Sequence, residues 1–170
     1  VYFKRIIKLT VAIFTLGLLF AFSTLWYFSS DLPDYKILAN YKPPISSRVH
    51  SGGGELIAEY ALQKRLFIPY ESIPKKVINS FLSAEDKNFF SHPGIDAKSI
   101  TRAIIKNLKN IYSNKRLEGA STITQQVAKN FLLTNEVSIK RKIKEAILAF
   151  RIERAYSKER IMELYLNQIY

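Results

Sequence analysis

The pattern of apolar and polar positions separates an N-terminal apolar block from a longer amphipathic region. Residues 9–28 (LTVAIFTLGLLFAFSTLWYF) are 20 consecutive residues without a charge. A helix of that length spans about 30 Å, the thickness of the hydrocarbon core of a bilayer. Three basic residues precede the block, and Asp31 and Asp34 follow it. The pattern predicts a membrane-spanning helix with a cytoplasmic N-terminus, because Lys and Arg concentrate on the cytoplasmic side.

A cleaved signal peptide is the alternative for this block. It is disfavoured because a signal core is roughly 7 to 15 residues long and is followed by a small-x-small cleavage site, which this sequence lacks. The expected organisation is therefore a cytoplasmic tail (1–8), a transmembrane helix (9–30), a proline-containing extended linker (31–47) and an exported domain (48–170).

After the linker, two alternating runs flank a triple glycine in SRVHSGGGELIAEY. This pattern is typical of a β-hairpin, here Arg48–His50 paired with Glu55–Tyr60. Arg65–Ile68 is a candidate for a further strand. The sequence thus predicts a small β-element before the main part of the domain.

From Pro74 onward the helical period dominates, which predicts a mainly α domain. A stripe that includes Phe81 and Phe89 indicates one helix, broken at Ser91–Gly94. Asp96 is the expected N-cap of the next helix. Further helices are expected at 121–133, 138–155 and 158–170.

Net charge narrows the class of partner. The chain carries 26 basic and 14 acidic residues, a net charge of +12, and no cysteine. The absence of cysteine excludes disulfides, thiolate zinc sites and cysteine nucleophiles. The positive charge favours a polyanionic partner, and the expected export of the domain excludes nucleic acid. Anionic lipid headgroups or a lipid-linked phosphate remain.

The segment SAEDKNFFSHPGID, Ser83 to Asp96, contains the first candidate catalytic groups. Glu85 lies four residues from both Phe81 and Phe89, so a continuous helix places it on the apolar stripe. Partial desolvation there would suit a carboxylate to proton transfer. The alternative is that Glu85 and Asp86 simply end a helix near solvent. His92 is either a general base or, as we favour, a structural histidine in the turn.

A second candidate carboxylate lies in NEVSIKRKIKEAILAF. Ile139, Ile143, Ile147 and Phe150 form a helical apolar stripe, with Glu145 off its centre. An ordinary ion pair with the preceding basic residues explains Glu145 as well as a functional role does. The surrounding basic cluster equally suits a phosphate.

The segment GASTITQQVAKNF concentrates neutral hydrogen-bonding groups and ends in a cation. Its structural interpretation is a helix that Ser121 caps and the other polar groups decorate. Its functional interpretation is a groove for a sugar or phosphate at a helix N-terminus, with Gly119 allowing close approach and Lys129 supplying charge.

Together, EDKNFFSHPGID, GASTITQQVAKN, RKIKEA and RIMELYLNQIY resemble the motifs of the peptidoglycan glycosyltransferase domain (glycosyltransferase family 51) of class A penicillin-binding proteins and their monofunctional relatives. The resemblance covers nearly all of residues 68–170. It implies a lysozyme-like, mainly α fold with a membrane-associated subdomain. It also implies an inverting enzyme that polymerises lipid II into β-1,4 glycan strands and releases undecaprenyl pyrophosphate.

The resemblance also implies roles for individual residues. Glu85 matches the base that deprotonates the acceptor 4-hydroxyl, and Glu145 matches the acidic residue that assists at the donor pyrophosphate, directly or through Mg²⁺ or Mn²⁺. The substrate-binding matches are Lys129, Arg141, Arg102, Ser121, Thr122, Gln125 and Gln126. Lys140 is added to them because it lies next to Arg141. Asp86, Phe89, His92, Gly94 and Gly119 match residues that shape the motifs. Implied partners are lipid II, the growing glycan chain, membrane lipids and the cell-wall synthesis machinery, at the outer face of the bacterial cytoplasmic membrane.

The sequence departs from the family pattern in two places. Some relatives carry an arginine in the loop that corresponds to Thr134–Val137, and this chain has none there. Pyrophosphate contacts are therefore expected to fall on Lys140 and Arg141. The last family motif is absent, so we expect a C-terminally incomplete domain. A lytic, lysozyme-like glycan hydrolase and an inactive membrane-anchored cell-wall binding module are the competing hypotheses.

Overall fold

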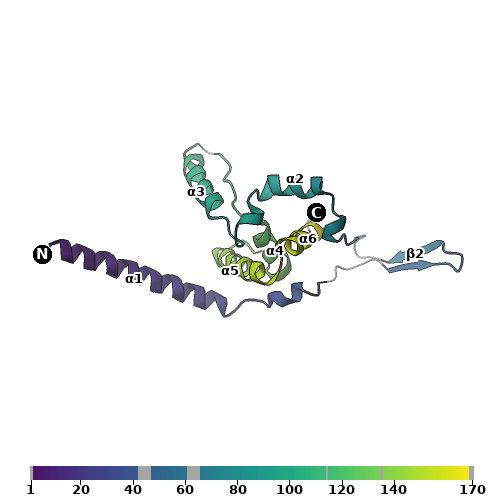
Figure 1. The fold of residues 1–170 in the computed structure, drawn as a ribbon, viewed down its shortest axis with the longest axis horizontal. Coiled ribbons are helices and arrows are strands. Elements are labelled where there is room, and N and C mark those ends of the chain that lie inside the picture. Colours follow the sequence, from purple (N-terminus) through teal and green to yellow (C-terminus); the bar gives the residue numbers. More distant parts are fainter. Residues whose placement is uncertain (1, 42–46, 61–65, 114, 135, 169–170) are drawn as a thin grey trace.

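The fold is mainly α, as predicted, with one long apolar helix and a two-stranded sheet (Figure 1). The structure is a computed structural model that describes residues 2–41, 47–60, 66–113, 115–134 and 136–168. The helices are α1 (Tyr2–Ser29), α2 (Lys75–Glu85), α3 (Ala97–Tyr112), α4 (Ile123–Leu132), α5 (Ile139–Ala155) and α6 (Lys158–Gln168). Short 3-10 turns occupy Tyr35–Leu38, Tyr70–Ser72 and Phe89–Ser91, and the strands are β1 (Ser47–His50) and β2 (Leu56–Tyr60).

Helix α1 projects from one end of the molecule, away from the helices of the domain (Figure 1). Its segment Phe3–Ser29 contains an 18-residue stretch with a mean hydropathy of 2.1, and it is long and apolar enough to cross a membrane. The helix begins at Tyr2, so the basic residues expected in a separate tail lie on its first turns. Its exposed apolar surface requires a non-aqueous environment, because water would leave that surface uncompensated.

The segment after α1 is less extended than its prolines suggested. A 3-10 turn that Asp34 caps covers Tyr35–Leu38, and the side chain of Leu38 is fully buried in the core. The hydroxyl of Tyr156 donates a hydrogen bond of 3.0 Å to the carbonyl of Tyr35. The first part of the expected linker therefore attaches α1 to the domain, while residues 42–46 lie outside the described residues.

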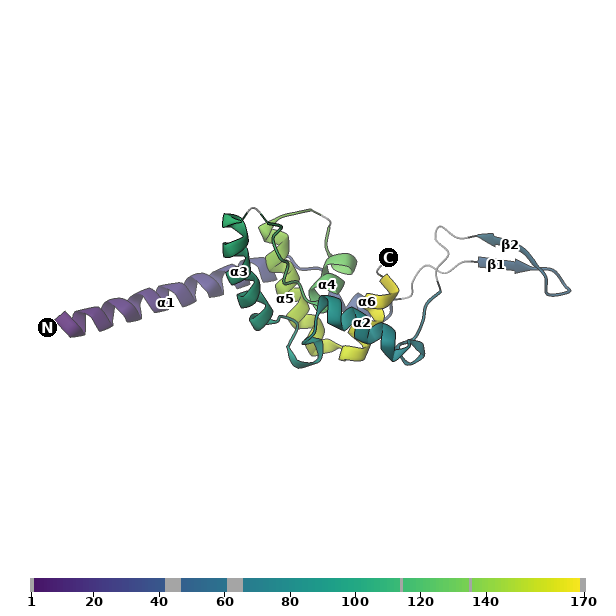
Figure 2. The same cartoon turned by 90° about the horizontal axis from the view of Figure 1, so that it is seen from above.

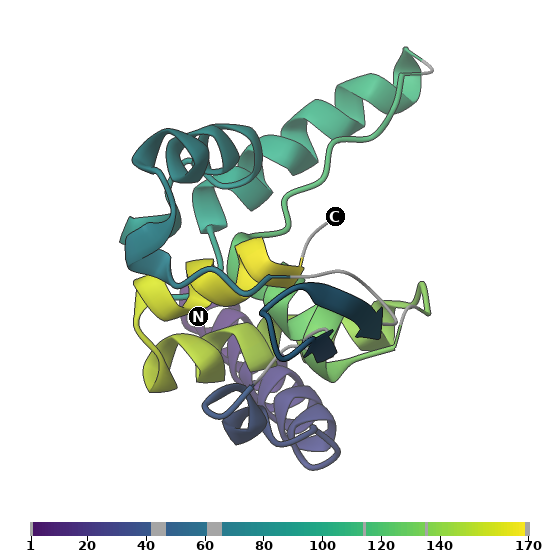
Figure 3. The ribbon, with the colours of Figure 1, turned by 90° about the vertical axis from the view of Figure 1, so that its right-hand side faces the viewer.

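The core lies where α4, α5 and α6 pack against one another (Figure 3). Each of these helices contributes fully buried apolar side chains, among them Ile123 and Val127 of α4, Leu148 and Ile152 of α5, and Ile161, Met162 and Leu164 of α6. Helices α4 and α5 begin at capped residues: Thr122 caps α4 and Ser138 caps α5. The caps satisfy free backbone N–H groups at the helix starts, which sets the boundaries of both helices.

The predicted hairpin is confirmed, and it extends from the end of the molecule opposite α1 (Figure 2). Strands β1 and β2 are antiparallel, with Ser47 opposite Tyr60 and Val49 opposite Ala58. The further strand expected at 65–68 is wrong for its described part, residues 66–68, which pair with no strand. There, the N–H of Ile68 donates instead to the side-chain oxygen of Asn167, at 2.9 Å.

The buried face of α5 differs from the predicted apolar stripe. Ile139 is 82% exposed and Phe150 is 44% exposed, whereas Glu145, Leu148 and Ile152 are buried. The prediction was wrong because a helix this rich in apolar residues presents two apolar faces. One face packs into the core, and the other faces the end of α1.

Gly94 allows the turn after α2 to approach α5 closely. Its φ of +96° lies in the left-handed region, and a Cβ there would lie 2.8 Å from the carbonyl oxygen of Ala149. Glycine is therefore required twice, once by its backbone conformation and once by this backbone contact.

We expect Gly94→Ala to lower the free energy of unfolding by about 2–4 kcal/mol, from left-handed strain plus overpacking. Urea unfolding of the chain in detergent, followed by far-UV circular dichroism, measures the change. Gly52→Ala is the matched control, because a Cβ at Gly52 meets no atom within 4 Å. Equal stability of the two variants would contradict this account of Gly94.

Candidate active site

A cavity of about 480 Å³ lies between the end of α2, the first turns of α3 and the segment that precedes α4. Polar groups dominate its wall, as a sugar or phosphate ligand requires. Among the site residues expected from the sequence, it is lined by Glu85, Asp86, Arg102, Gly119, Ser121 and Thr122. Segments far apart in the sequence therefore meet at this one cavity.

Glu85 is the last residue of α2, and it is exposed at the cavity. Asp86 ends the helix, so Phe89 belongs to the following 3-10 turn and not to a continuous stripe with Glu85. The expectation that Glu85 is partly desolvated on an apolar face was therefore wrong. What holds Glu85 is Gln126, whose amide donates a hydrogen bond of 2.9 Å to its carboxylate.

Tyr165 of α6 also lies near this carboxylate and was not expected from the sequence. Its side chain is almost fully buried. Burial raises the pKa of Tyr165 to about 12, and the negative charge of Glu85 contributes further. Its phenol therefore stays protonated at neutral pH.

Asp86 and His92 form a buried pair behind Glu85. Nε2 of His92 lies 3.0 Å from both carboxylate oxygens of Asp86. The N–H of Gly94 donates to Nδ1 of His92, which assigns the proton to Nε2 as donor to Asp86. Since both ring nitrogens are engaged inside the protein, His92 has the structural position that we favoured over a general base.

Asp86 also connects this turn to α4. Its carboxylate accepts the N–H of Ile123 at 3.1 Å, at the first residue of α4. Phe89 is fully buried beneath the same turn. An anion at a helix N-terminus is favourable, because the free N–H groups and the helix dipole both point to it.

Thr122, and not Ser121 as expected, caps α4. It forms a capping box with Gln125, in which each side chain accepts a hydrogen bond from the other's backbone N–H. The hydroxyl of Thr122 also donates a hydrogen bond of 2.6 Å to the carbonyl of Gly94. Thr122 and Gln125 are buried. Thr122 and Gln125 therefore stabilise the start of α4, while Ser121 and Gln126 face the site.

Glu145 is buried on α5, with only 2% of its side chain exposed. Lys142 lies 2.7 Å from one carboxylate oxygen, and Arg141 lies 3.3 Å from the other. Lys142 also donates a hydrogen bond of 2.6 Å to the hydroxyl of Ser121, at the cavity that contains Glu85. Lys142 was part of the basic cluster noted in the sequence, but its bridging position follows only from the fold.

Two atoms of this ion cluster are buried without a hydrogen-bond partner in the described part of the chain: Oε1 of Glu145 and Nε of Arg141. The 3.3 Å approach of Arg141 is thus a charge contact without hydrogen-bond geometry. Unsatisfied buried polar atoms cost free energy, so this ion cluster is incompletely satisfied within the described residues.

A second cavity, of about 460 Å³, lies beside the C-terminal end of α1. Lys140 and Arg141 line it, together with Asp31 and Lys144, which form an ion pair of 2.7 Å. Through Lys142 and Arg141, Glu145 therefore lies between the two cavities. Lys129 lines neither cavity, and its side chain makes no hydrogen bond or ion pair within the described residues.

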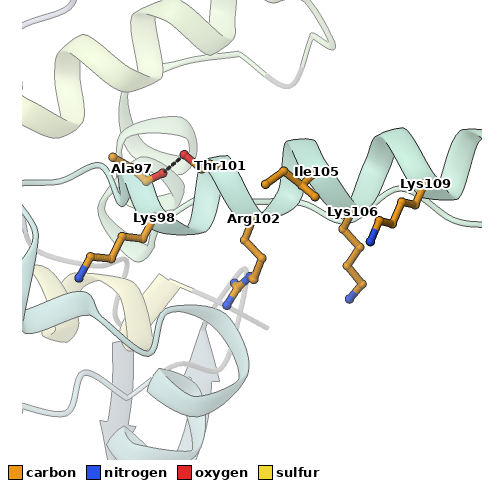
Figure 4. A pocket seen from close by; sticks show the side chains of 7 residues that line it. All are labelled: Ala97, Lys98, Thr101, Arg102, Ile105, Lys106 and Lys109. Atoms are coloured by element: carbon orange, nitrogen blue, oxygen red, sulfur yellow. Dashed lines mark hydrogen bonds between the residues drawn. The ribbon is translucent and has the colours of Figure 1, made fainter.

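Arg102 belongs to a basic face of α3. Lys98, Arg102, Lys106 and Lys109 project to the same side of this helix (Figure 4). Lys106 pairs with Glu118 at 2.6 Å, beside the cavity that contains Glu85. Positive charge therefore extends from the cavity along α3.

A second ion cluster, which sequence reasoning missed, ties the motifs together. Glu153 accepts hydrogen bonds from the hydroxyl of Thr124 at 2.5 Å and from Lys158 at 2.7 Å. Lys158 also donates a hydrogen bond of 2.7 Å to the carbonyl of His92. Its ammonium lies 4.4 Å from the centroid of the Phe89 ring. Only the fold could reveal this role, because Thr124 and His92 are distant in sequence from Glu153 and Lys158.

The residues around Glu145 do not fit a divalent cation. Both of its oxygens face cationic side chains, and cations there repel a metal ion. Within the ranges that the structure describes, no three His, Cys, Asp or Glu residues gather in one place. The side chains around Glu145 therefore disfavour the expected Mg²⁺ or Mn²⁺, and no chemical step is assigned to it.

Comparison with known proteins shows the family of the chain. A family model described as Transglycosylase matches residues 53–170. The chain belongs to the transglycosylase family.

Three similar proteins are all named penicillin-binding protein 1A. The one from Rickettsia felis is 56% identical over 86% of this chain, the one from Aquifex aeolicus is 49% identical over 82%, and the one from Pseudomonas aeruginosa is 46% identical over 91%. The chain spans only about a fifth of these relatives, namely 18%, 19% and 18% of their lengths.

Asp96 makes the free energy of unfolding depend measurably on pH. Asn88 and Ser99 donate hydrogen bonds of 2.9 Å and 2.7 Å to its carboxylate, which also caps α3. These bonds, that of Asn88 first, hold the pKa of Asp96 well below its ordinary value. A lowered folded-state pKa means that ionised Asp96 stabilises the fold above the unfolded-state pKa of about 4, and that this stability is lost as the pH falls below it.

We therefore expect Asp96→Asn, which keeps a capping side chain, to flatten the fall in unfolding free energy between about pH 4 and pH 2. Urea unfolding at several pH values measures that slope. Asp34→Asn is the matched control, an exposed cap that accepts one backbone N–H. An unchanged slope in Asp96→Asn would refute this assignment.

Proposed function

We propose that this domain is a peptidoglycan glycosyltransferase that polymerises lipid II into β-1,4 glycan strands and releases undecaprenyl pyrophosphate. The observation that carries the proposal is the position of Glu85. It is exposed in a polar cavity, held by Gln126, and connected through Ser121 and Lys142 to the buried ion cluster of Glu145. One free carboxylate and a nearby set of cations are the groups that glycosyl transfer from a pyrophosphate requires.

In the proposed reaction, Glu85 accepts the proton of the acceptor 4-hydroxyl. The hydroxyl oxygen attacks the anomeric carbon of the donor, the new glycosidic bond forms, and the bond from that carbon to the pyrophosphate oxygen breaks. Attack opposite the leaving group inverts the configuration. An exposed, hydrogen-bonded carboxylate suits this role, because it can reach a bound hydroxyl.

The leaving pyrophosphate gains negative charge as that bond breaks, so preorganised cations lower the barrier. Lys142 and Arg141 are both held against Glu145, which fixes their positions. We assign them to the pyrophosphate. Glu145 acts in this scheme as a positioning residue, since its buried carboxylate orients the two cations. Arg102 adds charge at the cavity that contains Glu85.

The proposed location is the outer face of the bacterial cytoplasmic membrane, with the N-terminus inside. It is supported by the apolar length of α1 and by the basic residues on its first turns. A substrate carried on a membrane lipid would reach the second cavity, which lies beside the outer end of α1. The name of the relatives, penicillin-binding protein 1A, supports a parent protein that also carries a transpeptidase domain.

We expect Glu85→Gln to abolish polymerisation when the protein that carries this domain is incubated with lipid II, because a neutral amide cannot take the hydroxyl proton. Gel separation of labelled glycan strands measures the product. The control is Glu71→Gln. Glu71 is also exposed but lies on the 3-10 turn Tyr70–Ser72, and this variant should keep wild-type activity.

The same assay separates the competing functions. Unchanged polymerisation in Glu85→Gln would contradict the assignment of Glu85 as the base. Release of muropeptides from finished peptidoglycan would show a lytic hydrolase. Neither product from the wild-type protein would favour the inactive binding module.

We expect Lys142→Met to lower the polymerisation rate by about 10²-fold, the usual cost of losing one preorganised charge-stabilising group. Lys142→Arg should recover part of the rate, because it keeps the positive charge. Initial rates with lipid II measure both variants, and Lys76→Met, an exposed lysine on α2, is the control. A full rate in Lys142→Met would remove Lys142 from the mechanism.

A further inference from the structure

A third cavity, of about 430 Å³, lies where the membrane helix meets the domain. Helix α1 contributes Leu25 and Ser29 to it, and the turn before α3 contributes Ile95. Helix α5 contributes Ile147, Phe150, Arg151 and Arg154, from the apolar face that does not enter the core. This cavity shares no lining residue with either cavity assigned to the reaction.

The position of the cavity along α1 gives its depth relative to a bilayer. Leu25 lies in the apolar helix, and Ser29 is its last residue, about 6 Å further along the axis at 1.5 Å per residue. Trp26 and Tyr27, of the types that mark membrane interfaces, lie between them. The cavity therefore lies at the boundary between acyl chains and headgroups.

The charges in this cavity have one sign. Arg151 donates to the hydroxyl of Ser29, and the guanidinium of Arg154 lies 5.1 Å above the ring of Phe150. Within the described part of the chain, neither guanidinium pairs with a carboxylate. By contrast, Lys144 pairs with Asp31 and Lys158 pairs with Glu153. Two uncompensated arginines beside an apolar wall are complementary to an amphiphilic anion.

We propose that this cavity binds one anionic phospholipid. Arg151 and Arg154 hold its phosphate, and one acyl chain lies along Leu25, Ile147 and Phe150. The guanidinium geometry matches phosphate oxygens, and the apolar wall replaces the acyl chain's contacts with neighbouring lipids. The bound lipid fills the space between α1 and α5, and so fixes the orientation of the domain relative to the membrane.

The test is a titration of the whole chain, in uncharged detergent, with dioleoylphosphatidylglycerol or dioleoylphosphatidylcholine. Native mass spectrometry counts the lipids that each chain retains. We expect saturation at a single phosphatidylglycerol per chain and about tenfold weaker retention of phosphatidylcholine, because only the former carries net negative charge. Equal retention of the two lipids would overturn the proposal.

Two variants test the two halves of the site. Arg151→Gln with Arg154→Gln should weaken phosphatidylglycerol retention about tenfold or more, through loss of charge-assisted hydrogen bonds. Ile147→Trp keeps both arginines but fills the apolar wall, and it should weaken retention to a similar extent. Lys75→Gln with Lys76→Gln removes the same charge from α2, on the far side of the domain from α1 (Figure 1), and should change nothing.

Circular dichroism establishes that each variant is folded. If the double arginine variant does not fold, Ile147→Trp decides the outcome. Wild-type retention in a folded Ile147→Trp variant would refute an acyl-chain site. Displacement of phosphatidylglycerol, one for one, by undecaprenyl pyrophosphate at lower concentration would also refute the proposal and assign the cavity to the reaction's lipid.

Discussion

The geometry of the candidate active site depends on one buried carboxylate, that of Asp86. It accepts hydrogen bonds from His92 and from the first backbone N–H of α4, so it joins the turn after α2 to the start of α4. Glu85 precedes it in sequence, and Gln126 lies in the first turns of α4. Their hydrogen bond therefore follows from the position of Asp86. A buried anion with only one of these donors would be costly, which makes both contacts necessary.

Much of this architecture could be predicted from the sequence because it depends on local rules. The 20-residue apolar block, the triple-glycine hairpin and the cap at Asp96 each depend on neighbouring residues, and the structure contains all three. The motifs likewise placed Glu85, Ser121 and Arg102 among the site residues, and they line one cavity. Family membership, which the motifs indicated, is confirmed over residues 53–170.

The errors arose where tertiary contacts outweigh periodicity. Phe81, Glu85 and Phe89 have helical spacing, yet α2 ends at Glu85, because Asp86 leaves the helical conformation to reach its buried partners. In the same way, Thr122 rather than Ser121 caps α4, since its hydroxyl also reaches the carbonyl of Gly94. Long-range hydrogen bonds of this kind leave no signal in a single sequence.

Helix α5 shows how one element serves both the site and the membrane. Its buried face carries Glu145 into the core, where Lys142 and Arg141 face two different cavities. Its second apolar face, with Ile147 and Phe150, meets the C-terminal end of α1. Lys144 adds an ion pair with Asp31, just past the end of α1. One rigid helix therefore contacts the long apolar helix α1 on one face and holds the ion cluster of Glu145 on the other.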